Sequence, residues 1–213
     1  MVKQSIIVLD DFYEDPEEVR RIACSLKFTP KENATYPGLE AFIEHPLWLE
    51  SRKKLRSYIN ESVDYESPLT EKFLQGKFRL AFEKNNYDRP DYVHEDMHRW
   101  SGIIYLALPE DCKGGIALYR HKKSGALSSN MEWYKKYYPY LFDLKDNDFK
   151  KALIDIFNDK HEWEQIGEIP MLYNRAILLM SQCFHGSTGL FGSTVENGRL
   201  TQNFQFFSEK DGL

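Results

Sequence analysis

The stretch YVHEDMHRWS, residues 92–101, limits the local fold because its two metal-binding interpretations need opposite secondary structures. As H-E-x-x-H, with His94, Glu95 and His98, it is the signature of zinc proteases and needs a helix that places both imidazoles on one face. As H-x-D, with His94 and Asp96, it supplies two ligands of an iron site. That pattern needs a strand, in which residues two apart share a face.

The zinc-protease interpretation lacks the further residues that such a site requires. The extended signature continues as H-x-x-G-x-x-H, but Ser101 stands at the glycine position and no histidine follows at the required spacing. The following residues 102–104 (GII) favour an extended chain over a continued helix. We therefore favour the strand and keep a zinc protease acting through His94, Glu95 and His98 as a remote alternative.

Several segments predict short strands. Alternating side chains mark KFRLAFEK and WSGIIYLAL. GIALYRH, NRAILLM, CFHGSTGLF and GRLTQNFQFF have the texture of strands and turns. Two helices are expected earlier, one capped by Asp15 with Pro16 in its first turn, and one from about Pro46 to Ile59. This order predicts a mainly β protein with flanking helices, a β-sandwich or jelly roll.

The length of 213 residues and the hydrophobic content of 42% suit one domain, residues 1–213, with a buried core. Within it we expect a helical support region (residues 1–75) and a β core (residues 76–121 and 169–208). The insertion between them, residues 122–168, is rich in charged and aromatic side chains. A segment of this length between strands is expected to be either a lid over the site or a packed surface subdomain.

Charge and hydropathy favour an ordinary cytoplasmic protein. The net charge of −5 gives no overall basic field of the kind that attracts nucleic acid, so we expect no nucleic-acid partner. The apolar run from Ile6 to Leu9 is too short for a signal peptide or a membrane span, so no membrane partner is expected. Cys24, Cys112 and Cys183 form no paired motif and are interpreted as packing residues.

The strand interpretation of H-x-D needs a third ligand and a binding group for a second molecule. A ferrous site with two histidines and one carboxylate keeps positions open for substrate and oxygen. His185, in CFHG, can supply the second imidazole. Further on, Arg199 and Thr201 in GRLTQNF share one strand face, where a guanidinium and a hydroxyl can hold a carboxylate.

Several pieces now follow one another in a fixed order along the chain. They are an H-x-D pair, a YL strand, a glycine pair, a second histidine and R-x-T, at His94 and Asp96, Tyr105 and Leu106, Gly114 and Gly115, His185, and Arg199 and Thr201. This ordered set resembles the Fe(II)/2-oxoglutarate-dependent oxygenases, in particular their prolyl-hydroxylase-like branch. The resemblance implies a double-stranded β-helix core, which is a cupin-like jelly roll.

The resemblance also implies roles for individual residues. It implies that Fe(II) is bound by two imidazoles and a carboxylate, from His94, Asp96 and His185. It further implies that Arg199 and Thr201 hold the distal carboxylate of 2-oxoglutarate, with Tyr105 as an additional hydrogen-bond donor. His98, Arg120 and His121 are weaker candidates for contact with the substrate.

The activity implied by the resemblance is hydroxylation of an unactivated C–H bond, with O2 as cosubstrate and succinate and CO2 as coproducts. The substrate would be a small molecule, an amino acid or a peptide side chain. Asp96 argues against halogenation, because halogenases of the family carry a small residue at that position. The alternative from another class is a non-catalytic β-helix module that binds a ligand or a protein.

Overall fold

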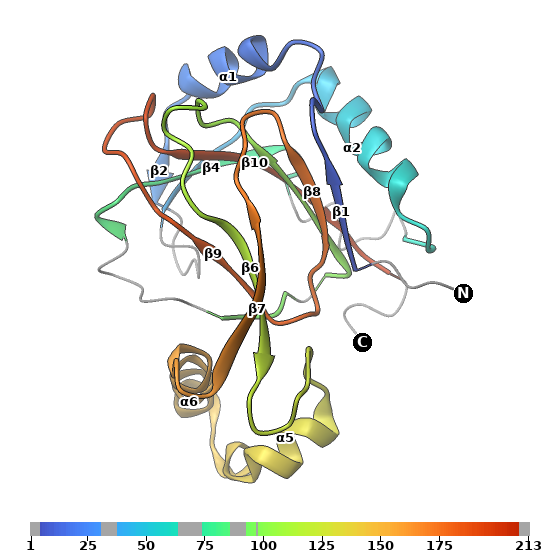
Figure 1. Ribbon diagram of the computed structural model, residues 1–213, viewed down its shortest axis with the longest axis vertical. Helices are drawn as coiled ribbons and strands as arrows, with labels where there is room; N and C mark the ends of the chain where they lie inside the picture. Colours follow the sequence, from blue (N-terminus) through green and yellow to red (C-terminus); the bar gives the residue numbers. More distant parts are fainter. Residues whose placement is uncertain (1–4, 31–37, 64–73, 86–92, 97, 209–213) are drawn as a thin grey trace.

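The strands of the protein form two antiparallel sheets, seen in the computed structural model of Figure 1, which describes residues 5–30, 38–63, 74–85, 93–96 and 98–208. The large sheet has the strand order β1-β8-β5-β10-β4-β3-β2, and the small sheet the order β7-β6-β9. The strands of the large sheet are β1 (Ile6–Leu9), β2 (Thr29–Pro30), β3 (Leu39–Ala41), β4 (Lys77–Ala81), β5 (Trp100–Tyr105), β8 (Ala176–Met180) and β10 (Arg199–Phe206). Those of the small sheet are β6 (Gly115–His121), β7 (Trp163–Pro170) and β9 (His185–Thr188).

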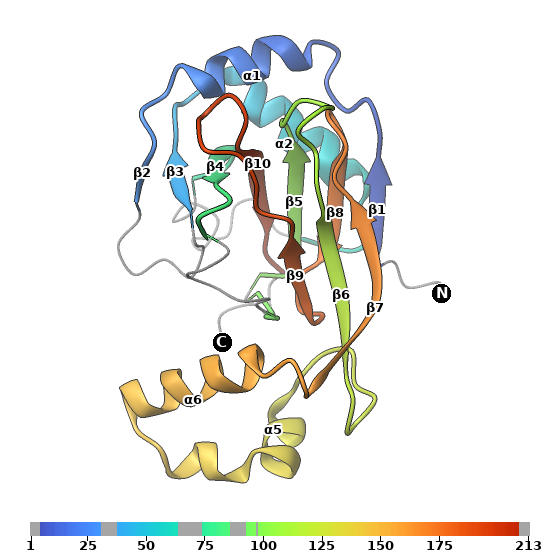
Figure 2. The same cartoon turned by 60° about the vertical axis from the view of Figure 1, so that its left-hand side comes forward.

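Two helices, α1 (Pro16–Cys24) and α2 (Pro46–Tyr58), lie over the outer face of the large sheet (Figures 1 and 2). The sequence explains where they begin. The Asp15 side chain accepts a hydrogen bond from the Glu18 N–H at 2.9 Å, which caps α1 as expected. Each helix carries a proline in its first turn, where the missing N–H has no intrahelical partner in any case.

Successive side chains along β5 and β10 point alternately to the two faces of the large sheet. Ile104 and Phe204 pack against the helices in the outer core. Tyr105 faces the small sheet and packs in the inner core with Ile116 of β6. The predicted mainly β fold with flanking helices and a jelly-roll core is confirmed. Arg199 and Thr201 of β10 lie on the inner face of the large sheet.

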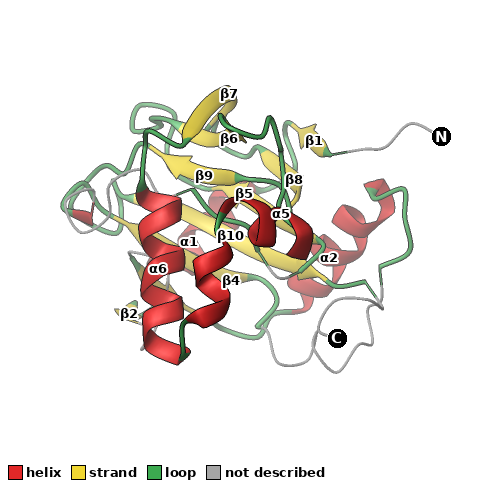
Figure 3. Cartoon of the chain, turned by 90° about the horizontal axis from the view of Figure 1, so that it is seen from below, coloured by secondary structure: helices red, strands yellow, loops and turns green. Residues whose placement is uncertain are grey.

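A helical subdomain, residues 131–158, connects β6 to β7 and lies beyond the ends of these strands (Figures 2 and 3). It consists of α5 (Met131–Tyr137), the 3₁₀ helix η1 (Pro139–Asp143) and α6 (Asp146–Asn158). Trp133, Leu141 and Phe157 are buried in a second core, to which Trp163 of β7 also contributes.

Strand β7 begins at Trp163, inside the range 122–168 that the sequence suggests as an insertion. It is an edge strand, paired only with β6 in the small sheet. Most of its side chains are exposed and polar, so it lacks the apolar alternation that marks the inner strands. The part of the chain that leaves the two sheets is therefore shorter than the sequence suggests.

The three cysteines are free and partly buried, which agrees with a packing role. Within the described part of the chain, none of the helices has both the length and the apolar character needed to cross a membrane.

Candidate metal centre

His94 and His185 lie side by side in an antiparallel β-bridge. The His94 N–H donates to the His185 carbonyl at 2.8 Å, and the His185 N–H donates to the His94 carbonyl at 3.0 Å. His185 opens β9, while His94 forms an isolated bridge, and residues 93–96 and 98 contain no helix. The backbone at H-x-D is thus extended, and the helix required by H-E-x-x-H is not formed there.

Asp96 is held by its backbone and by one carboxylate oxygen. Its N–H donates to the Ser181 carbonyl at 2.8 Å, which ties the segment to the end of β8. The Ser101 hydroxyl donates to Oδ2 at 3.0 Å, and His98 Nε2 lies 3.4 Å from the same oxygen and 2.5 Å from Ser101 Oγ. These contacts fix the carboxylate plane through Oδ2.

His94, Asp96 and His185 bring one ligand atom each into a space in which the three atoms lie within 4.8 Å of one another. Nε2 of His94 is 3.9 Å from Oδ1 of Asp96, and Nε2 of His185 is 3.7 Å from Oδ2. His185 Nδ1 lies 2.8 Å from the Cys183 carbonyl, which can only accept, so Nδ1 carries the proton. Nε2 of His185 then has a free lone pair that points to the centre of the group.

The charge of Asp96 follows from its surroundings. Burial by itself would raise its pKa, but the neighbouring imidazoles of His98, His185 and His94 outweigh burial and hold the pKa well below its usual value. The carboxylate is therefore ionised at neutral pH. Ionised carboxylate and neutral imidazole are the forms in which these groups bind a metal ion.

A cavity of about 100 Å³ opens on this group between the two sheets. The residues that line it come from the H-x-D segment and from β4, β5, β6, β9 and β10; they are Arg79, His94, Asp96, His98, Ser101, Ile103, Ile116, His185, Ser187, Arg199, Thr201, Asn203, Phe204 and Gln205. Asp96 is the one acidic side chain among these described residues. The rest of the polar lining is cationic or neutral, which suits an anionic ligand.

Arg199 and Thr201 lie in this cavity lining, as the sequence suggests, and both are almost fully buried. Arg199 Nη2 donates to the Gly115 carbonyl at 3.3 Å, and its guanidinium lies over the Tyr105 ring at 5.6 Å. Arg199 Nε and the Tyr105 hydroxyl have no hydrogen-bond partner in the described part of the chain. Burial, opposed by Arg199, raises the pKa of Tyr105 to about 12, so its hydroxyl stays protonated and can donate.

The sequence did not point to several polar residues of the cavity. Asn203 and Gln205 continue the two-residue period of Arg199 and Thr201 along β10, so this period could have revealed them. Arg79 stands opposite Thr201 on β4, which only the strand pairing reveals.

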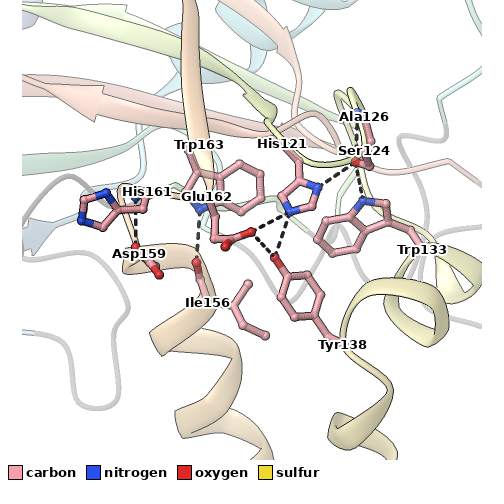
Figure 4. A network of polar contacts seen from close by, with 10 residues as sticks. All are labelled: His121, Ser124, Ala126, Trp133, Tyr138, Ile156, Asp159, His161, Glu162 and Trp163. Carbon is pink, nitrogen blue, oxygen red and sulfur yellow. Dashed lines mark hydrogen bonds and ion pairs between the residues drawn. The ribbon is translucent and has the colours of Figure 1, made fainter.

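Arg120 and His121 are not brought to the cavity, although His98 is. Arg120 is exposed and pairs with Glu164 at 2.8 Å across β6 and β7. His121 is fully buried at the end of β6, where its ring nitrogens contact three side chains, Ser124, Tyr138 and Glu162 (Figure 4). Both side chains are thus engaged near the helical subdomain, because β6 pairs with β9 only as far as Leu118 and beyond that point pairs with β7 alone.

Glu95, the would-be catalytic residue of the zinc-protease pattern, points away from the cavity. Its carboxylate accepts hydrogen bonds from both the N–H, at 2.7 Å, and the hydroxyl of Ser129. Burial raises the pKa of Glu95, while the hydrogen bonds from Ser129 act in the opposite direction. Glu95 is therefore engaged in holding Ser129, a contact that the sequence does not indicate.

A sequence comparison places the chain in a family. The profile described as "Family of unknown function (DUF6445)" matches residues 1–206. The chain belongs to DUF6445. No curated protein matches this DUF6445 chain in a sequence comparison.

A structure comparison finds solved proteins similar to this DUF6445 member. HygX from Streptomyces hygroscopicus, crystallised with nickel and 2-oxoglutarate bound, has a TM-score of 0.51 and 12% identity, with 97% of this chain and 84% of HygX covered. The α-ketoglutarate-dependent epimerase SnoN has a TM-score of 0.45 and 12% identity, with 96% and 78% covered. The Fe(II)/α-ketoglutarate-dependent dioxygenase TqaL has a TM-score of 0.43 and 8% identity, with 96% and 83% covered. The similarity to HygX shows that the two proteins have the same overall fold.

Proposed function

We propose that this DUF6445 member is an Fe(II)- and 2-oxoglutarate-dependent dioxygenase. The reaction is hydroxylation of an unactivated C–H bond in a small molecule, an amino acid or a peptide side chain, with succinate and CO2 as coproducts. The observation that carries this proposal is the convergence of three metal-ligating atoms from His94, Asp96 and His185 on a cavity that Arg199 also lines.

The donor set fits ferrous iron. Two imidazole nitrogens and one carboxylate oxygen are the protein ligands of non-haem iron oxygenases, in which other positions stay open. The proton on His185 Nδ1 leaves Nε2 of His185 free to bind a metal ion, and Asp96 is ionised, as a carboxylate ligand must be. No other described group of three or more such residues in the chain has this geometry.

The part of the cavity lined by Arg199 fits the distal carboxylate of 2-oxoglutarate. Arg199 is 3% exposed and makes no ion pair with a carboxylate of the described residues, and its Nε has no hydrogen-bond partner there. A buried cation without a counter-ion is costly, so an anionic ligand would stabilise it. Thr201 and Tyr105 place two hydroxyl groups beside it.

When bound, iron and 2-oxoglutarate supply the oxidising chemistry. The protein's own residues orient and enclose the reactants. Ser101 and His98 hold Asp96 through Oδ2, and the Cys183 carbonyl orients His185. Ile103 and Ile116 give the cavity apolar walls, which exclude water from the reacting groups.

Three finer statements belong to the same proposal. The chain is assigned to the prolyl-hydroxylase-like branch on the order of its motifs. It acts in the cytoplasm on a small-molecule or peptide substrate, without a nucleic-acid or membrane partner. HygX, which shares the fold, was crystallised with 2-oxoglutarate, and this supports 2-oxoglutarate as the cosubstrate.

The test is succinate formation from 2-oxoglutarate in the presence of Fe(II), ascorbate, O2 and a panel of amino acids, small metabolites and peptides. We expect a substrate to stimulate succinate release, and His94→Ala, Asp96→Ala and His185→Ala each to abolish it, because each removes one of three protein ligands. His161→Ala, at an exposed histidine outside the cavity, is the matched control and should keep activity. Full activity in Asp96→Ala would refute the metal assignment.

The same assay separates the alternative of a non-catalytic binding module. Such a protein would bind 2-oxoglutarate or another ligand without releasing succinate under any condition of the panel.

A further inference from the structure

The residues directly before both metal-site histidines are buried in the core of the helical subdomain. Val93 precedes His94, and Phe184 precedes His185. Both belong to the cluster formed with the aromatic residues of α5, α6 and β7, and neither lines the cavity. In each extended segment, therefore, one side chain points to the cavity and its predecessor points into the subdomain core.

Phe184 is the centre of this packing. It is fully buried, and its ring centroid lies 4.6 Å from that of Trp163, 5.5 Å from Trp133 and 6.2 Å from Phe157. Ring pairs at such separations are favourable contacts beyond their buried area. The backbone just before His185 is consequently anchored by side chains from three elements.

A short segment before α5, residues 127–129, contacts both ligand segments. The Leu127 carbonyl accepts from the Phe184 N–H at 2.8 Å, next to His185. Ser129 donates twice to the carboxylate of Glu95, which lies between the two ligands of the H-x-D motif. The segment 127–129 thus contacts both parts of the chain that carry the metal ligands, through the Phe184 backbone and the Glu95 side chain.

The position of this segment is itself fixed at both ends. On one side the His121 N–H donates to the Ala126 carbonyl at 2.9 Å. The Ser124 hydroxyl oxygen accepts from the Ala126 N–H at 3.1 Å and the Trp133 indole N–H at 3.0 Å, so its proton is left for His121 Nδ1 (Figure 4). On the other side Asn130 caps α5 by accepting from the Trp133 N–H at 2.8 Å.

We propose that the helical subdomain, together with the segment 127–129 that leads into it, sets the spacing of the metal ligands. Ser129 is a positioning residue that acts through Glu95 on His94 and Asp96. This rests on the proposed metal centre and adds a purpose for the subdomain. The pair of hydrogen bonds at Glu95 and the packing of Val93 and Phe184 hold the two ligand segments from the side opposite the cavity. Removing the Ser129 hydroxyl should loosen the metal site without emptying any core.

The experiment is a titration of the metal-free protein with Co(II), followed by its visible absorption spectrum. For Ser129→Ala we expect Co(II) affinity to fall roughly tenfold, as it does for residues that orient metal ligands, with a changed band shape. Ser129→Thr keeps the hydroxyl and should restore affinity and spectrum. Ser128→Ala, at the exposed neighbouring serine, is the matched control and should bind Co(II) like the wild type.

Two results would overturn the positioning role. One is wild-type Co(II) affinity and spectrum in Ser129→Ala, whatever its melting temperature. The other is an equal loss of affinity in Ser128→Ala, which would make the effect unspecific. His185→Ala tests the metal centre separately: if it binds Co(II) as tightly as the wild type, the proposed function fails, independently of the result at Ser129.

Discussion

At the scale of single residues, the arginines differ in whether a carboxylate of the protein pairs with them. Arg99 pairs with Glu61 at 2.9 Å, and Arg175 pairs with Asp10 at 2.6 Å. Arg199 is buried, and among the described residues its guanidinium donates a hydrogen bond to the Gly115 carbonyl. A guanidinium in that position is expected to be completed by a ligand, because its planar fork matches a carboxylate.

The prediction at this scale concerns 2-oxoglutarate affinity. Arg199→Ala should weaken binding by about 2 to 5 kcal/mol, because the buried ligand carboxylate would lose its charged partner. Thr201→Val, which removes a single hydroxyl, should have a smaller effect. The measurement is calorimetric titration of Co(II)-loaded protein with 2-oxoglutarate. Arg21→Ala, at an exposed arginine of α1, is the control, and equal affinities in the Arg199 and Arg21 variants would place the anchor elsewhere.

At the scale of elements, the pairing of β3, β4 and β10 builds a polar row across the inner face of the large sheet. Thr201 stands opposite Arg79, and Arg79 opposite Glu40. Glu40 lies 3.1 Å from Lys77 Nζ and 3.0 Å from Arg79 Nε. Glu40 on β3 thus helps to fix the side chain of Arg79, which lines the cavity from β4.

The prediction at this scale concerns stability. Burial would raise the pKa of Glu40, but Arg79 and Lys77 outweigh it and lower the pKa. Glu40→Gln should therefore lower the free energy of unfolding at pH 7 by about 1 to 3 kcal/mol, since two partly buried cations lose a charged acceptor. Because the folded-state pKa is depressed, this stabilisation is present above the unfolded-state pKa, about 4.3, and is lost as pH falls through the folded value.

Urea unfolding of the wild type and Glu40→Gln at pH 7 and at pH values below about 4 measures both parts of this prediction. The difference between the two proteins should shrink in acid. Glu132→Gln, which alters an exposed pair with Lys135, should change stability by under about 0.5 kcal/mol. A difference at Glu40 that stays constant with pH would show that the carboxylate charge contributes nothing.

At the scale of the whole molecule, local periodicity predicted the structural features that depend on residues close together in the sequence. The mainly β character, the cap of α1 and the face shared by Arg199 and Thr201 all follow from spacing over a few residues. The jelly-roll topology was expected from the resemblance carried by the ordered motifs. Strand β7 was missed because its exposed polar side chains hide the alternation.

Contacts between distant residues escaped prediction for a different reason. The pair Glu95 and Ser129 joins residues 34 positions apart, and local patterning carries no signal for it. The same holds for Arg79, whose place beside Thr201 depends on strand order. Two roles of this region remain predictions. One is that the helical subdomain positions the segments that carry the metal ligands. The other is that residues 122–168 cover the cavity as a lid.

The most direct measurement is a crystal structure of the protein soaked with Co(II) and 2-oxoglutarate, with anomalous data at the cobalt edge. We expect one anomalous peak about 2.0 to 2.2 Å from Nε2 of His94, Nε2 of His185 and a carboxylate oxygen of Asp96. We also expect 2-oxoglutarate in the cavity with its distal carboxylate within hydrogen-bond distance of Arg199. A peak bound by other residues, or a 2-oxoglutarate carboxylate away from Arg199, would contradict the proposed metal and cosubstrate sites.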